Sequence, residues 1–459
     1  MKKFSIIALS FLLLMSFTAI AYAIHVPGLP EGESVVVSKD TSITLGGRIL
    51  VRGWYFDNVE WGAGEWEPED SNSIALYTTN LYLYVDAKIT DNLQAYMELE
   101  TCNNSTGTSG LYVWGSNDAK PDANLFFRQA WIQYTGSGLL GVPSGIKVGH
   151  QLLTIGEKQF LNLERFGTDA IVVFTNPVKE LHIAALTAKI EEGDGVPGRQ
   201  TFTDNTDDLD AYIVLGTYKL DKDNTIGANY TFLNLPDADL SFSNIGLHAN
   251  GLLMGALSYA AELDFQFGEI DDPGEDIGGW GIMAKAAYKL DPVNLRASFA
   301  YGSGDDDAGD VDSEEFQVIM GNDDVSPLAR FVHYTQIFER TIRTAAHDQL
   351  GTVDGRSTGI ANTTYYNLGL DYMPMKDLSL SLDGFYLLAT ETDSWGSDVD
   401  DNLGWEIDFK GSYKITKNLS YFMELGWFDA GDFYKSSGLV DSDELESVTQ
   451  IVHGLNLTF

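Results

Sequence analysis

Apolar and polar residues alternate along much of this chain. Between Leu81 and Ile89 every second residue is apolar, and the alternation resumes from Leu93 to Leu99 after a turn at residues 90–92. Side chains of a β-strand point alternately to its two faces. The pattern therefore predicts a hairpin of two strands that share one apolar face and one polar face.

The same period-two pattern recurs in segments of about ten residues, the length that crosses a bilayer as a tilted strand. The predicted strands cover residues 43–56, 74–89, 93–102, 124–135, 145–153, 168–176, 180–191, 208–220, 225–234, 242–249, 255–268, 279–290, 295–303, 362–373, 378–390, 402–414, 419–428 and 447–459.

Connections between these segments alternate between short and long. Short turns rich in Asn, Asp and Pro occupy residues 90–92, 176–179, 221–224, 291–294, 374–377 and 416–418. Longer stretches occupy residues 57–73, 103–123, 154–167, 192–207, 235–241, 269–278, 304–361, 391–401 and 429–446. Barrels of the outer membrane have short periplasmic turns and longer extracellular loops. The sequence thus predicts an all-β fold, a transmembrane antiparallel β-barrel of about 18 strands, with 16 as the alternative.

The beginning of the chain is typical of a secretory signal peptide. Lys2 and Lys3 precede an apolar run, and small residues at Ala21 and Ala23 suit a signal peptidase. We expect residues 1–23 to be removed, residues 24–42 to form a periplasmic segment and residues 43–459 to form the barrel.

The last predicted strand ends in an aromatic residue. Phe459 closes a segment in which Ile451, Leu455 and Leu457 share one face. We expect this strand to pair with residues 43–56, so that no edge stays open, and Phe459 to be read by the outer-membrane insertion machinery. The predicted location is the outer membrane of a Gram-negative-type bacterium, with its lipids as a partner.

Composition narrows the function. The formal net charge is -39, which disfavours nucleic acid as a partner. Hydrophobic residues make up 44% of the chain, too many for a disordered protein. Cys102 is the only cysteine, so the chain can form neither an internal disulfide nor a thiolate metal site.

The polar faces of the predicted strands carry charges of both signs. If these faces point inward, they line an aqueous channel wide enough for solutes, because about 18 strands leave a lumen. The candidate pore-lining residues are Arg48, Arg52, Lys88, Glu98, Glu100, Glu262, Asp264, Lys285, Lys289, Arg296, Asp383, Glu406, Asp408 and Lys410.

The excess negative charge falls in the long loops, which predicts a negative mouth that concentrates cations. The densest cluster offers five carboxylates that suit Ca²⁺, a hard cation with oxygen ligands: Asp305, Asp307, Asp310, Asp312 and Glu314. The alternative is a solvated acidic loop, and we expect no cofactor to be required.

Residues 304–361 form the longest connection and hold much of the scarce positive charge. Arg330, Arg340 and Arg343 are candidates for a constriction, while Leu328, Phe331, Val332, Phe338 and Ile342 approximate helical spacing. Such a loop either folds into the barrel as a constriction or forms an extracellular cap.

Several motifs resemble the alginate export family of outer-membrane barrels. They are Phe127 to Ile132, Gly149-His150-Gln151 with Gly156, Phe166 to Ala170, Tyr301 to Asp307, Gly404 to Asp408, Asn418-Leu419 and Gly431 to Phe433. The resemblance implies an 18-stranded barrel and secretion of an anionic polyuronate through a basic lumen. His150 stands where the family has Arg, so the resemblance supports the architecture more than the cargo.

The leading hypothesis is an outer-membrane, porin-like channel for passive passage of ions and small hydrophilic solutes, with a weak preference for cations. The alternatives are a secretion channel for an anionic polysaccharide, with Arg48, Arg52, Lys88, Lys285, Lys289 and Arg296 as a basic track, and a structural or adhesive surface barrel. An enzyme is not expected, because the sequence lacks Gly-x-Ser-x-Gly and His-Glu-x-x-His motifs.

Overall fold

A computed structural model describes most of the chain. The described residues are 33–36, 41–58, 73–103, 112–115, 123–138, 141–191, 209–235, 240–270, 274–306, 312–320, 334–342, 359–396, 398–438 and 447–459.

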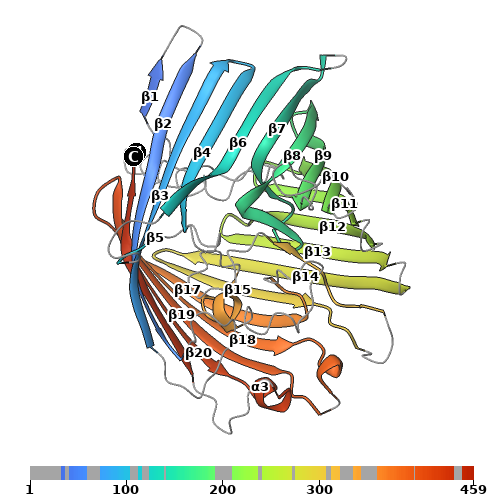
Figure 1. Cartoon of the computed structure of the whole chain (residues 1–459), viewed down its shortest axis with the longest axis vertical. Coiled ribbons are helices and arrows are strands. Elements are labelled where there is room, and N and C mark those ends of the chain that lie inside the picture. Colours follow the sequence, from blue (N-terminus) through green and yellow to red (C-terminus); the bar gives the residue numbers. More distant parts are fainter. Residues whose placement is uncertain are drawn as a thin grey trace.

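Eighteen strands in this part of the chain form one closed antiparallel ring (Figure 1). They are β2 (Ser42–Asp57), β3 (Ser73–Thr90), β4 (Leu93–Asn103), β6 (Ala123–Ser137), β7 (Pro143–Thr154), β8 (Leu161–Val178), β9 (Leu181–Glu191), β10 (Leu209–Lys219), β11 (Asn224–Leu235), β12 (Leu240–Leu253), β13 (Leu257–Ile270), β14 (Glu275–Leu290), β15 (Val293–Gly302), β17 (Thr363–Met375), β18 (Leu378–Ala389), β19 (Asn402–Lys414), β20 (Leu419–Ala430) and β21 (Val448–Thr458). Each pairs with the next, and β21 pairs back to β2. The predicted 18-stranded barrel is confirmed.

A few short elements lie outside the ring. β1 (Glu33–Val36) pairs with the start of β2, β5 (Tyr112–Val113) pairs with β3, and β16 (Ile319–Met320) runs parallel to the start of β8. Three single helical turns are η4 (Phe338–Ile342), η6 (Asp393–Trp395) and α3 (Phe433–Ser436). No helix among the described residues has the length and apolarity needed to cross a membrane.

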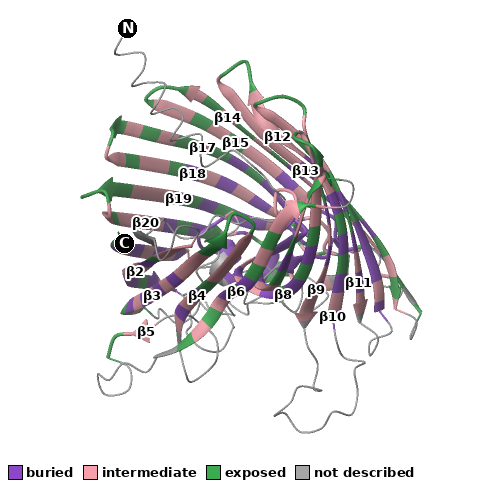
Figure 2. Ribbon diagram, turned by 90° about the horizontal axis from the view of Figure 1, so that it is seen from above, coloured by how far each residue is buried: buried purple, intermediate pink, exposed green. Residues whose placement is uncertain are grey.

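The two faces of the wall differ as the alternation predicts. On β19, Trp405 and Ile407 are 53% and 48% exposed, whereas Glu406 and Asp408 between them are buried. The same banding runs along strands around the ring (Figure 2). Aromatic side chains lie near both ends of the outer face. Tyr386 and Trp405 are tilted against each other at the loop end, with ring centroids 4.5 Å apart, and the exposed Tyr413 lies at the turn end of β19. An apolar outer face with aromatic ends suits a bilayer.

The connections depart from the prediction at three points. The loop expected at residues 154–167 is reduced to 155–160, because β8 begins at Leu161. β11 and β12 are separated by only four residues, and so are β13 and β14, where the pattern predicted loops at 235–241 and 269–278. Strand pairing continues there beyond the apolar pattern, since backbone hydrogen bonds do not depend on the side chain.

The chain closes on itself through Phe459. Its carbonyl accepts the Gly47 N–H at 2.8 Å, and its own N–H donates to the Gly47 carbonyl at 3.1 Å. The Asn418 side-chain amide donates to the Thr458 carbonyl at 2.7 Å. The expected pairing of the last strand with the first is therefore confirmed, and the Phe459 ring packs over Gly47.

We predict that Gly47→Ala weakens this closure. A Cβ at Gly47 would lie 2.7 Å from the Phe459 ring and 2.6 Å from the Tyr82 carbonyl oxygen. Such overpacking should lower the free energy of unfolding by about 1–3 kcal/mol, measured by urea unfolding in detergent micelles. Gly216→Ala is the matched control, because the nearest atom there is 3.8 Å away. Equal stability of the two variants would contradict the prediction.

Candidate functional site: the lumen and its inward-folded segments

All the candidate pore-lining residues lie on the face of the ring opposite its exposed apolar side chains. They fall on β2, β3, β4, β13, β14, β15, β18 and β19. Lys88 lies near the turn end of β3 and is exposed, while Lys285, Lys289 and Lys410 are half-buried. The acidic members, by contrast, are buried. The inner wall therefore presents lysines at its open surface and keeps most of these carboxylates covered.

Two arginines of the inner wall lie against aromatic rings. The Arg52 guanidinium is 4.6 Å from the Trp54 ring centroid, and its Nη2 donates to the Asn80 side-chain oxygen at 2.8 Å. Arg48 lies 5.8 Å from the centroid of the Tyr82 ring. Cation–π contact holds both side chains flat along the wall.

Glu98 and Glu100 on β4 pair with arginines that the sequence pattern did not identify. Arg128 Nη1 lies 2.9 Å from Glu98 Oε1, and Arg165 Nη1 lies 2.8 Å from Glu100 Oε2. Period-two alternation places Arg128 on the outer face, but a register shift opposite Glu98 and Leu99 turns it inward. An arginine facing lipid is energetically unfavourable, so an arginine at an outward position of the alternation indicates a bulge that turns its side chain inward.

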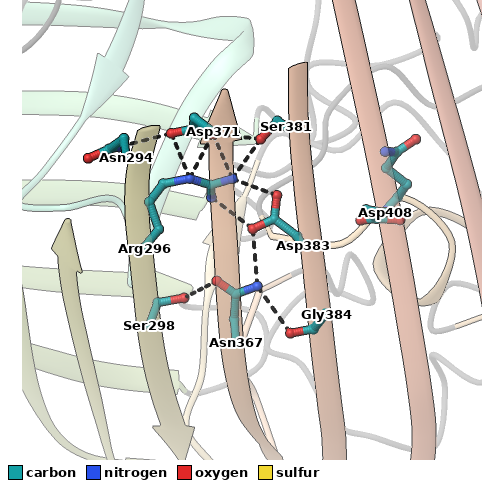
Figure 3. A network of polar contacts seen from close by, with 10 residues as sticks. Asn294, Arg296, Ser298, Asn367, Asp371, Ser381, Asp383, Gly384 and Asp408 are labelled. Carbon is teal, nitrogen blue, oxygen red and sulfur yellow. Dashed lines mark hydrogen bonds and ion pairs between the residues drawn. The ribbon is translucent and has the colours of Figure 1, made fainter. Parts of the chain in front are cut away.

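Arg296 on β15 ties three neighbouring strands together (Figure 3). Its Nε donates to both oxygens of Asp371 on β17 at 3.0 Å. Its Nη1 and Nη2 each donate to an oxygen of Asp383 on β18 at 2.8 Å. Ser381 also accepts from Nη2. The guanidinium is therefore fully engaged, and two carboxylates outweigh its single positive charge.

Described parts of the long connection at 304–361 pack against the inner wall. Phe316, Ile337 and Phe338 are fully buried, and Phe338 lies 6.0 Å from the ring centroid of Phe428 on β20. The Gln317 N–H donates to Gln266 on β13 at 2.7 Å. Residues 312–320 and 334–342 thus lie inside the ring. We call them, together with residues 155–160, the inward segments.

Wall carboxylates hold the inward segments by their backbone. Glu406 accepts the N–H groups of Gln336, Ile337 and Phe338 at 2.7–2.8 Å, and Asp408 accepts that of Gln336 at 3.1 Å. Backbone donors that converge on a carboxylate make strong, charge-assisted hydrogen bonds. Segment 334–342 is therefore fixed to β19.

The turn at 155–160 is held in the same way by β12 and β13. Glu262 on β13 accepts the N–H of Glu157 at 2.5 Å and that of Gln159 at 3.3 Å. Asn250 on β12 donates to the Glu157 carboxylate at 2.6 Å.

One sector of the inner wall is apolar, which corrects the expectation of a polar lumen throughout. The sector runs over β8–β12 and includes Val172, Ala211, Ile213, Leu215 and Phe242, all at most 3% exposed. Leu153, Ile155, Phe160 and Leu161 pack over it. The β7–β8 connection folds inward because this sector and the connection are both apolar, so that burial of one surface by the other is favourable.

The candidate constriction arginines cannot be placed in the lumen. Arg330 and Arg343 lie outside the described residues, as do Leu328, Phe331 and Val332, and Arg340 is described only in its backbone, within η4. Of the candidate Ca²⁺ ligands, Asp307 and Asp310 lie outside the described residues. Among the residues that are described, no cluster of His, Cys, Asp and Glu could hold a metal ion.

The loop between β18 and β19 carries acidic residues at the end of the barrel where the long loops lie. Asp393, Asp398, Asp400 and Asp401 are exposed there. Partial burial and the nearby carboxylates of Asp306 and Asp393 raise the pKa of Glu391. Mutual repulsion of this kind is what a negative rim produces.

Comparisons with known proteins agree with this architecture. The family model for alginate export matches residues 236–447. Three solved structures have a TM-score of 0.52 and cover 90% of this chain and 98% of theirs: Pseudomonas aeruginosa OccK5 (OpdH) at 14% identity, P. aeruginosa OccK8 (OprE) at 12% and Acinetobacter baumannii OccAB4 at 9%. These structures show a shared fold. No curated protein matches the chain.

The family match includes the resembling motifs from Tyr301 onward but not those before residue 236. His150, which the sequence resemblance alone aligns with a family arginine, faces outward on β7, where its Nδ1 lies 3.1 Å from Asp169 Oδ1 and its Nε2 lies 2.8 Å from the Phe166 carbonyl oxygen. The residue at this position therefore belongs to the outer wall and not to the inner surface.

We predict that Glu406→Gln loosens segment 334–342. The amide keeps one acceptor oxygen but places an NH₂ group against backbone donors. Loss of charge-assisted hydrogen bonds worth about 1.5–3 kcal/mol should speed hydrogen exchange of the amides at 336–338 by roughly 10- to 100-fold. Mass spectrometry of the barrel in micelles measures this rate.

Glu424→Gln on β20 is the control, because it neutralises an inward carboxylate on the neighbouring strand. Exchange at 336–338 should keep its original rate in this variant. An unchanged rate in Glu406→Gln would show that packing of Ile337 and Phe338, and not the carboxylate, fixes the segment.

Proposed function

We propose that this chain, a porin-like β-barrel of the Gram-negative outer membrane that resembles the alginate export family, is a passive channel for ions and small hydrophilic solutes. One observation carries the proposal. Polar side chains of the inner wall stay partly exposed, including Asp86, Asp371, Lys410, Glu424 and Asn456. A sealed core would bury such groups completely.

The inward segments support a channel with a restricted middle. They cover Glu262, Glu406 and Asp408, so solutes must pass beside them. Residues nearer the short turns, such as Lys289 and Lys410, are only half-buried. This arrangement supports a water-filled vestibule below a narrower zone, which selects for small solutes.

Purified protein reconstituted in a planar bilayer tests the channel. We expect stepwise, ohmic conductance that does not require an energy source. Correctly folded protein that inserts but carries no current would contradict the proposal and favour a structural or adhesive barrel.

A weak preference for cations follows from the balance of charge. The Arg296 network carries two carboxylates for one guanidinium, and the rim adds Asp393, Asp398 and Asp400. Each attracts cations over a distance set by salt.

We therefore predict a reversal potential of cation-selective sign across a KCl gradient. The permeability ratio of K⁺ to Cl⁻ should be about 2–5 near 0.1 M salt and should approach 1 near 1 M, where the Debye length falls to about 3 Å. Addition of divalent cations should reduce it further. An anion-selective sign would mean that the lumenal Lys and Arg control passage.

Export of an anionic polysaccharide is the second candidate, because the family model for alginate export matches residues 236–447. The proposed basic track is interrupted in this chain. Arg296 is engaged by two carboxylates, and Arg52 is buried against Trp54. We expect polyuronate oligomers not to block the current at concentrations where small solutes pass; competitive block would favour export.

A further inference from the structure

We propose that Glu262, Asp264, Asn229 and His248 form a binding site for a protonated amine on the inner wall, beside the inward turn at 155–160. The inference deepens the proposed function, on which it rests, by naming a class of solute that the channel would hold. The four residues come from three neighbouring strands, β11, β12 and β13.

Strand register brings these side chains together. His248 on β12 lies directly opposite Glu262 on β13, and Gly246, two residues away, lies opposite Asp264. On the other side of β12, Asn229 on β11 is also opposite Gly246. Because side chains of one parity share a face, all four point to the inner side of the wall.

Gly246 makes room for two of the ligands. The position that its missing Cβ would take lies 2.7 Å from Asp264 Oδ1 and 2.9 Å from Asn229 Oδ1. The carboxylate and the amide therefore converge over this glycine from the two flanking strands. Gly227 plays the same part for His248, whose ring lies over it.

The converging groups keep buried polar atoms that have no hydrogen-bond partner among the described residues, apart from the contact of the Glu262 and Asp264 carboxyl groups with each other. These atoms are both amide atoms of Asn229, both ring nitrogens of His248, Oε1 of Glu262 and Oδ2 of Asp264. All four residues are at most 5% exposed. A buried polar atom without a partner is unfavourable, so this many in one place indicates a site built for a hydrogen-bonding ligand.

The other carboxylate oxygens are already used. Asp264 Oδ1 accepts from the Asn244 amide at 2.9 Å, and Glu262 Oε2 accepts from the backbone of the inward turn. These bonds fix the orientation of both carboxyl groups, which also lie within hydrogen-bonding distance of each other. Preorganised acceptors of this kind lower the cost of ordering a site on binding.

The cluster is rich in carboxyl groups. Glu262 interacts electrostatically with Asp264 and Glu157, and Lys285 on β14 is the nearby cation that makes no ion pair among the described residues. Lys158 also lies close but is bonded to Glu164. Glu262 and Asp264 lie close enough to repel each other when both are ionised, and either a shared proton or a bound cation relieves that repulsion.

The acceptor types favour an ammonium group over a metal ion. An –NH₃⁺ group has three donors, which match two carboxylate oxygens and either the Asn229 oxygen or a His248 nitrogen. Among the described residues, no group of three or more His, Cys, Asp and Glu side chains could hold a metal ion. An ammonium group bonds its acceptors at about 2.7–2.9 Å, a longer distance than the roughly 2.3–2.6 Å between Ca²⁺ and its oxygen ligands.

Binding is tested on the full-length barrel in detergent by isothermal titration calorimetry with methylammonium chloride. Tetramethylammonium chloride, which has the same charge but no N–H donor, and potassium chloride are the comparison salts. We expect saturable binding of methylammonium that exceeds binding of either comparison cation at least tenfold. Equal affinity for all three would overturn the proposal, since it would reflect general negative charge.

Two variants locate the site. Asp264→Asn removes a charge without changing size, and Gly246→Ala keeps the charge but places a Cβ where Asp264 and Asn229 converge. Each should weaken methylammonium binding at least tenfold. Glu424→Gln, an inward carboxylate on β20, is the control and should bind as the original protein does. Heat-modifiable mobility on gels confirms that every variant is folded.

Binding that survives in both folded variants would overturn the proposal; the two carboxylates would then share a proton instead. Titration with n-butylammonium distinguishes two kinds of ligand. Binding of n-butylammonium would show that the site is open to an amine on a larger solute, whereas binding of methylammonium alone would indicate a closed site that fits only a small ammonium ion. Calorimetry needs no current, so failure of this site and failure of the channel are separate results.

Discussion

Backbone hydrogen bonding inside a bilayer is the constraint on which the rest of this structure depends. Lipid offers no partner for an N–H or C=O group, so a membrane-spanning sheet must have no open edge. The ring meets this requirement where β21 pairs with β2, from Arg48 opposite Thr458 to Asp57 opposite Thr449. Once the ring is closed, lipid fixes only the outer face, and the inner face is free to differ from one sector to the next.

Inside the ring a second form of the same constraint operates. The inward segments leave the strand ladder, so their backbone N–H groups need other acceptors. Glu406 and Glu262 supply them, and those carboxylates in turn could not be buried without donors. The wall carboxylates therefore accept the N–H groups of the segments, and these N–H groups in turn satisfy the buried carboxylates. Removal of either partner would leave buried polar groups unsatisfied.

Sequence alone predicts the ring but not its contents. All 18 ring strands follow from period-two alternation, because lipid requires an apolar side chain at every second position. Arg128 was missed since one bulge inverts the parity of the strand. The contact between Gln336 and Glu406 joins residues 70 positions apart, and no local pattern encodes it. Lys285 and Glu262 were identified as inward, but their grouping with Asn229 and His248 depends on register across three strands.

Because the inner sector of β8–β12 is apolar and covered, the number of strands in this barrel does not by itself fix the width that is open to solutes. The number of strands sets the circumference of the barrel. The inner faces of β8–β12, however, contact the β7–β8 connection, so this part of the circumference does not line water. In the channel that we propose, the passage is then eccentric, displaced toward the strands that keep polar inner faces. In such a barrel the size limit for solutes can evolve through a few side chains of one sector while the number of strands, and with it membrane insertion, stays constant.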